Sequence, residues 1–243
     1  MPNRRSILLS SLLVSALLIP SLAQAQRKIK TENQPNFDLR PFHFGFLLSY
    51  NTADFFVKMK PYDALADSLL VMDHVKQPGF NLGIVTSLNM TDNLSLRFIP
   101  TLSFQERVLS YRFRRSDGSP IGFDKPIEST WLEFPLLLKM RSDRINNFAV
   151  YVIAGGKYSI DMASQKDVNQ DLDEDIVVKL AKNDYSAEVG GGMDMFLPYF
   201  KFGMELKFGV GIPNLLIDDG TRFSMPIESL RSKTWIFTFT FEG

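Results

Sequence analysis

The sequence predicts an all-β protein: an eight-stranded antiparallel transmembrane β-barrel of the outer membrane, with long extracellular loops and short periplasmic turns. Three observations predict this fold. The stretch Lys233–Phe241 puts aromatic side chains on one face of a strand and threonines on the other, as a lipid-facing barrel strand does. Similar alternating segments recur along the chain, and the connections between them are long and short in turn. The N-terminus has the form of a secretory signal peptide.

The N-terminal segment predicts export. Arg4 and Arg5 precede an apolar run, Ile7–Ile19, and the small-residue sequence Ala23-Gln24-Ala25. This order predicts a signal peptide at residues 1–25, cleaved after its last alanine. The alternative is a membrane-anchoring helix, but the run is shorter than the ~20 residues that a span needs.

Composition excludes several classes of protein. The chain has 243 residues, with 27 basic and 27 acidic side chains, so no electrostatic case exists for nucleic-acid binding. The absence of cysteine removes disulfides, thiol catalysis and cysteine zinc sites. No second long charge-free apolar run is present, which excludes a helical membrane protein.

The polar stretch 26–41 has no periodicity and is expected to be a flexible periplasmic lead-in. The barrel domain is expected over residues 42–243. Its predicted strands are Phe42–Tyr50, Gly79–Asn89, Leu94–Phe113, a strand around Leu132–Met140, Phe148–Ile160, Tyr185–Phe196, Phe200–Val210 and Lys233–Phe241. Pro100 interrupts the third strand, which implies a bulge or a free donor position. The run Gly190-Gly191-Gly192 in the sixth strand is interpreted as a bend.

The connections measure about 28, 4, 14, 6, 24, 3 and 21 residues, the outer-membrane pattern with both termini in the periplasm. The long ones are Asn51–Pro78, with a helical turn expected around Tyr62–Met72, Arg114–Ile127, Asp161–Asp184 and Ile212–Ser232. A soluble barrel such as a lipocalin has the same alternation with its apolar face inward. The signal peptide, the loop asymmetry and the charged inner faces favour the membrane barrel.

Charged side chains recur on the predicted inner faces. They are Glu133, Glu188, Asp194 and Glu205 with Arg97, Lys139, Lys157, Lys201 and Lys207. An eight-stranded barrel is only just wide enough for side chains to fill. We therefore expect these charges to pair into a network that plugs the lumen, because unpaired buried charge is costly. The alternatives are a selective pore, or a carboxylate that acts as an acid or base.

One acidic stretch invites a calcium interpretation. The stretch Asp167–Asp175 begins with the ligand spacing of an EF-hand loop, but Leu172 and Val178 stand where that loop requires glycine and glutamate. We therefore expect a solvated acidic loop there. Asp218-Asp219-Gly220 is most simply a turn.

The histidines are the remaining catalytic candidates. An enzyme that modifies outer-membrane lipid would need a histidine with a serine and an acid at one site. His43 begins a predicted strand and His74 lies in a predicted loop, while Ser49 shares only the polar face of a strand with His43. No Gly-x-Ser-x-Gly, Walker or dinucleotide glycine loop is present. We predict no enzyme activity and no catalytic, cofactor-binding or metal-binding residues.

Three segments carry a resemblance to a known family. They are Phe44-Gly45-Phe46-Leu47-Leu48 with Tyr50-Asn51 and Asp54-Phe55, then Leu132-Glu133-Phe134-Pro135-Leu136-Leu137-Leu138-Lys139-Met140-Arg141-Ser142, and Tyr151-Val152-Ile153-Ala154-Gly155-Gly156-Lys157-Tyr158. With them the chain, from Phe42 to Phe241, resembles the PorT family of outer-membrane barrels, also called SprT.

The resemblance implies a non-enzymatic accessory component of the type IX secretion system, which exports folded cargo with C-terminal secretion domains. Other type IX secretion components are the implied partners. Because the barrel is narrow, the implied role is assembly, stabilisation or partner contact. The alternative is a stand-alone small outer-membrane barrel for adhesion or ligand binding through Asn51–Pro78 and Asp161–Asp184. Outer-membrane lipid and the barrel assembly machinery are further expected partners, the latter through the C-terminal aromatic strand.

Overall fold

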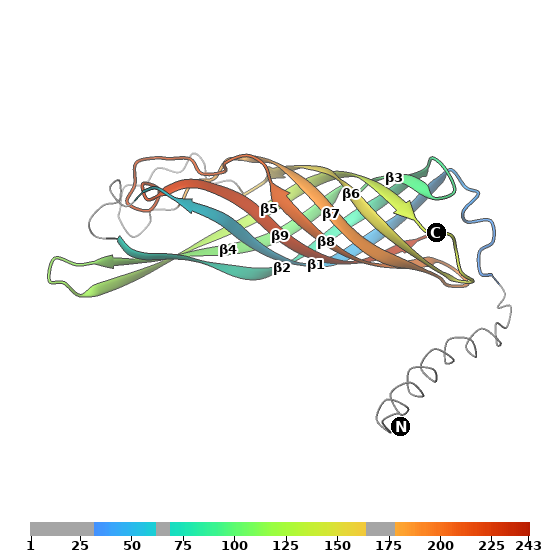
Figure 1. Cartoon of the computed structure of the whole chain (residues 1–243), viewed down its shortest axis with the longest axis horizontal. Helices are drawn as coiled ribbons and strands as arrows, with labels where there is room; N and C mark the ends of the chain where they lie inside the picture. The colour runs from blue at the N-terminus through green and yellow to red at the C-terminus, as the bar shows by residue number, and fades with distance from the viewer. Residues whose placement is uncertain (1–31, 62–68, 164–177) are drawn as a thin grey trace, which may run out of the picture. The chain divides into compact units, whose positions relative to one another are not determined.

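The computed structural model describes residues 32–61, 69–163 and 178–243. The predicted signal peptide and the acidic stretch 167–175 lie outside these residues and stay predictions. The described part contains nine strands in one sheet (Figure 1). They are β1 Phe42–Met59, β2 Leu69–Asn89, β3 Leu94–Phe98, β4 Thr101–Arg114, β5 Pro120–Arg141, β6 Phe148–Asp161, β7 Asn183–Phe196, β8 Lys201–Gly211 and β9 Ile227–Glu242.

The sheet closes on itself into a barrel. Strand β1 pairs antiparallel with β2 on one side and with β9 on the other. Strands β3 and β4 both lie between β2 and β5, so they are two halves of one strand position, and the ring has the eight positions that the sequence predicts. The break falls at Pro100, which has no N–H to donate; its carbonyl still accepts from Ile84 N at 3.0 Å.

The apolar face of the wall points outward. Phe44, Phe46 and Ile84 are 60–61% exposed, whereas the alternate residues His43 and Val85 are at most 1% exposed. This sidedness is that of a barrel wall facing lipid, and it contradicts the lipocalin-like alternative. Among the described residues, no helix is long and apolar enough to cross a membrane.

The strands extend further on the extracellular side than the sequence predicts. Strand β1 continues to Met59, β5 begins at Pro120 and β9 begins at Ile227, so much of the predicted loop length is paired strand. The expected helical turn is wrong for Leu69–Met72, which belong to β2, and residues 62–68 lie outside the described part. Beyond the lipid band the outward face meets water, so the apolar alternation that marks a barrel strand is lost there.

The two ends of the barrel differ in construction. At the periplasmic end, short turns at residues 90–93, 142–147 and 197–200 join the strands, and the C-terminus lies beside them (Figure 1). At the other end the β4–β5 hairpin projects beyond its neighbours (Figure 1). The interior between these ends holds both charged and apolar side chains.

Candidate functional site

All the predicted inward charges lie inside the barrel. Each of the nine, Arg97, Glu133, Lys139, Lys157, Glu188, Asp194, Lys201, Glu205 and Lys207, is at most 8% exposed. The strand alternation places them there, because successive side chains of a strand face opposite sides of the sheet. The prediction of a buried charged lumen is confirmed.

Most of these charges form one continuous chain of ion pairs of alternating sign. It runs Lys201–Glu242 at 2.9 Å, Glu242–Arg97 at 3.1 Å, Arg97–Glu205 at 3.0 Å, Glu205–Lys207 at 3.4 Å, Lys207–Glu188 at 3.4 Å, Glu188–Lys157 at 3.0 Å and Lys157–Glu133 at 3.0 Å. A separate pair joins Lys139 to Asp194 at 2.7 Å. The lumen is thus plugged by paired charge, as expected.

Glu242 is the member that sequence reasoning missed. It accepts from both Lys201 and Arg97 and is 1% exposed. The signal was present, since Glu242 continues the even-numbered inward series of Thr238 and Thr240, one residue past the aromatic row. With Glu242 included, every lysine and arginine of the predicted set has a carboxylate partner.

Apolar side chains pack beside the ion pairs. Leu47, Val85, Ile99, Leu137, Tyr151 and Ile153 form one buried cluster inside the barrel. Tyr151 links it to the ion pairs, because its hydroxyl donates to Glu205 at 3.0 Å and its ring lies 3.6 Å from the Lys139 ammonium. Gly192 leaves room for that ring, since a Cβ there would stand 2.6 Å from the Tyr151 hydroxyl. Gly192, the last glycine of the run predicted as a bend, thus serves close packing.

The extracellular end of the interior is closed by an apolar cap, which we define as residues 212–226 between β8 and β9. Phe223 and Leu215 of the cap are fully buried. They pack with inward residues of the extended strands, among them Tyr111, whose hydroxyl donates to the Phe223 carbonyl at 3.0 Å. The Lys125 ammonium lies 4.7 Å from the Phe223 ring. The sequence predicted this segment only as a loop.

Part of the cap is the predicted Asp218-Asp219-Gly220 turn, which is confirmed. Gly220 N–H donates to the Asp218 carboxylate at 3.1 Å, and Gly220 has a φ of 72°. This hydrogen bond, with one from the Lys60 ammonium, holds the pKa of Asp218 below its ordinary value of 3.8. The Asp218 carboxylate therefore stabilises the turn itself.

The periplasmic end is closed by a different segment, Asn33–Pro41, which we call the strap. Phe37 of the strap is 4% exposed and lies in the mouth of the barrel, where its ring stacks on His43 at 3.9 Å between centroids. The edge of Phe196 meets it at 5.7 Å, and the Lys201 ammonium lies 4.8 Å from its centroid. The expectation of a flexible lead-in is therefore wrong for these residues.

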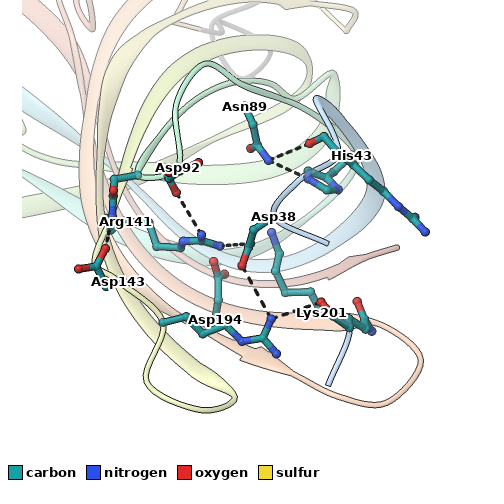
Figure 2. Close-up of polar contacts among 12 residues, drawn as sticks. Asp38, His43, Asn89, Asp92, Arg141, Asp143, Asp194 and Lys201 are labelled. Carbon is teal, nitrogen blue, oxygen red and sulfur yellow. Dashed lines mark hydrogen bonds and ion pairs between the residues drawn. The ribbon is translucent and has the colours of Figure 1, made fainter. Parts of the chain in front are cut away.

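Polar contacts hold the strap on both sides of Phe37. Asp38 pairs with Arg141 at 2.6 Å, as Figure 2 shows. It also pairs with Arg144 of the β5–β6 turn at 3.8 Å. Asn89 donates through its side chain to the Arg40 carbonyl at 3.0 Å and to His43 Nε2 at 2.9 Å (Figure 2). The polar, aperiodic sequence gave no sign of these contacts, because they are all made with residues distant along the chain.

The catalytic candidates are not brought together. His43 lies in the periplasmic mouth, whereas His74 lies on the extracellular part of β2, where it contacts Asp54 at 2.6 Å. Ser49 Oγ is hydrogen-bonded to Thr238 Oγ1 at 2.8 Å and not to a histidine. Among residues 32–61, 69–163 and 178–243, no group of three or more metal-ligating side chains is found.

A match to a protein family agrees with this architecture. Residues 23–216 match the family model of the outer membrane protein beta-barrel domain. No curated protein matches the chain.

Several solved structures are similar in fold. The outer membrane protein OprG from Pseudomonas aeruginosa is 12% identical, with 83% of this chain and 95% of that chain covered and a TM-score of 0.48. Neisserial surface protein A is 10% identical, with 82% and 96% covered and a TM-score of 0.42. Ail of Yersinia pestis, solved with the heparin analogue sucrose octasulfate, is 11% identical, with 84% and 100% covered and a TM-score of 0.36.

Proposed function

The chain belongs to the family of outer membrane protein β-barrel domains, and from that premise we propose that it is a closed, non-enzymatic barrel that supports the type IX protein secretion system. It acts in the outer membrane by contacting other secretion components. The signal peptide at residues 1–25 and the periplasmic position of residues 26–41 are part of the proposal. Its lipid-facing wall contacts outer-membrane lipid, and the C-terminal strand is read by the barrel assembly machinery.

The observation that carries the proposal is the filled interior. The described residues close the barrel three times, with the strap, the ion-pair chain and the apolar cap. A barrel filled in this way offers cargo no path through its lumen. Its contribution to secretion therefore comes from surfaces. The resemblance of three segments to the PorT family supplies the secretion system as the setting.

The exposed apolar side chains favour the periplasmic face as the contact surface. Tyr199 of the β7–β8 turn and Leu39 of the strap are 92% and 77% exposed, the highest values among the large hydrophobic side chains of the described residues. They lie at the periplasmic end, beyond the lipid-facing wall, where they meet water. Water-facing apolar side chains of this kind mark interaction sites.

Deleting the gene tests the proposal. We expect cargo proteins with C-terminal secretion domains to accumulate in the periplasm while the outer membrane stays otherwise intact. Complementation with L39S/Y199A is expected to restore secretion poorly. The matched control is M162S/I212S, which alters two residues that are each 63% exposed at the other end of the barrel and is expected to restore secretion fully. Normal secretion in the deletion strain overturns the proposal.

The second candidate function is adhesion or ligand binding by a stand-alone barrel. The projecting β4–β5 hairpin favours it, because that hairpin rises clear of the other strands on the extracellular side (Figure 1). Purification in mild detergent separates the two candidates. Stable co-purification of secretion components is expected only from the first, and the barrel alone is expected from the second.

A further inference from the structure

We infer that the periplasmic mouth is a peptide-binding site for an aromatic residue followed by an acidic residue, and that Phe37-Asp38 of the strap occupies this site in cis. A partner segment with the same pair of residues binds there when the strap leaves. The inference rests on the proposed function, since it specifies the chemistry of a partner at the periplasmic face.

The first subsite selects an aromatic ring. His43 stacks on Phe37 with an interplanar angle of only 7°, and Phe196 meets the same ring edge-on at 81°. The Lys201 ammonium lies 4.8 Å from the ring centroid, within cation–π distance. An aliphatic side chain could occupy the space, but it would lose both the stacking and the cation–π attraction.

The second subsite selects a carboxylate. Arg141 and Arg144 both face Asp38, and their side chains are only 13% and 8% exposed. Within the described residues, Asp38 is the only carboxylate in ion-pair contact with either guanidinium. Two further contacts fix the position of Arg144: its guanidinium lies 3.7 Å from the centroid of the Phe196 ring and donates to the Asn147 side chain at 3.0 Å. The barrel therefore holds two positioned guanidiniums for one acid.

The strap is separable from the barrel wall. It contributes no strand, and the ring closes through the β1–β9 pairing without it. Its first residues bind the end of β7 and the turn that follows it: Asn33 donates to the Phe196 carbonyl at 2.9 Å and Gln34 to the Leu197 carbonyl at 2.8 Å. Release of the strap breaks no strand pairing, and every group that binds Phe37 and Asp38 stays on the barrel.

A cleft beside the strap gives an incoming segment its first contact. Its volume is about 260 Å³, and it is lined by Gln34, Pro35, Asn36, Phe37, Arg40, Tyr199 and Gly243. One wall of the cleft is the strap and another is the exposed Tyr199. A partner can thus bind next to Phe37 before it replaces Phe37.

Competition between the strap and a free peptide determines how much weaker the peptide binds to the wild-type protein. A strap tethered to the barrel competes at an effective concentration of about a millimolar. The apparent Kd of a free peptide is its intrinsic Kd divided by the fraction of mouths that are open. A strap bound about 90% of the time therefore weakens peptide binding about tenfold, and weakening the strap restores it.

The test uses the full chain refolded in detergent micelles and a fluorescein-labelled peptide with the sequence of residues 32–41. Fluorescence anisotropy measures its binding to wild type and to the strap variant F37A/D38A. We expect saturable one-to-one binding to the strap variant and binding at least about tenfold weaker to wild type. The control protein M162S, altered at an exposed position at the other end of the barrel, is expected to behave like wild type. The same peptide carrying alanine at both positions is expected not to bind.

The inference is overturned if the folded strap variant does not bind the peptide, or binds the alanine peptide equally well. Heat-modifiable mobility in gel electrophoresis establishes folding. Should F37A/D38A fail to fold, D38A alone serves, with tighter peptide binding than wild type expected and unchanged binding overturning the inference. These measurements use purified protein, so their failure leaves the secretion phenotype untouched. Normal secretion after deletion would overturn the proposed function without altering the peptide binding.

Discussion

The separate pair Lys139–Asp194 offers the sharpest test of the charged lumen. Its atoms are 2.7 Å apart and its side chains are 4% and 0% exposed. Removing one partner leaves the other charge buried without its counter-ion, so K139M and D194N are each expected to lower the free energy of unfolding by about 3 to 5 kcal/mol. The double variant K139M/D194N leaves no orphan charge. It should therefore cost about 2 to 3 kcal/mol less than the sum of the single variants.

A double-mutant cycle isolates this interaction energy. Lys139 also contacts the Tyr151 ring, but that contact is lost in both K139M and the double variant and cancels in the cycle. Urea unfolding in lipid vesicles, followed by tryptophan fluorescence, measures all four proteins. The control cycle uses Lys58–Glu228, at 2.5 Å but 67% and 44% exposed, with an expected interaction energy below about 1 kcal/mol. Equal interaction energies in the two cycles would refute the reasoning that burial makes the lumen pairs strong.

Three further outcomes are expected. The strap variant stays non-conducting in planar lipid bilayers, because the ion-pair chain still fills the lumen; a steady current would identify the strap as the only barrier. F239S/F241S blocks membrane insertion, measured as loss of the heat-modifiable band from the membrane fraction. Each substitution loses about 2 to 3 kcal/mol of apolar burial, and F241S also loses the stack of Phe241 on Phe46 at 4.9 Å. Normal insertion would show that the aromatic row serves packing alone. G192A loses about 1 to 3 kcal/mol in urea unfolding through overpacking, whereas G191A, whose Cβ would meet its nearest atom at 3.3 Å, loses less.

The sequence predicts the parts of the fold that lie within the lipid. There the outward side must be apolar and the inward side packs a narrow lumen, so a period of two residues is imposed on every strand. That period alone placed Arg97, Glu133 and Asp194 inside, and all three are buried. The break at Pro100 was equally visible, because a missing N–H interrupts a strand wherever it falls.

The closures at the two ends could not be predicted in the same way. Phe37 packs against Phe196 and Phe223 against Tyr111, both far away in the chain, and the neighbours of Phe37 and Phe223 in sequence show no periodicity. The water-facing extensions of β1 and β5 were not predicted for a related reason. Their strands pair through backbone hydrogen bonds, and no side-chain pattern indicates this pairing where the outward face is neither lipid-facing nor buried.

The two closures also differ in what it takes to open them. The apolar cap is held by the chain on both sides, between β8 and β9, and its residues Leu215 and Phe223 belong to the same buried cluster as Ile227 and Leu230 of the wall. Lifting the cap therefore exposes that apolar cluster and costs the burial of several large side chains. The strap joins the barrel wall only at its C-terminal end. It is held by the carboxylate of Asp38 and by hydrogen bonds at Asn33, Gln34 and Arg40, and Phe37 is its one buried large apolar side chain. The periplasmic end is consequently the one that can open, because a binding partner can offset the free energy that opening costs. The exposed Leu39 and Tyr199 lie at this same end.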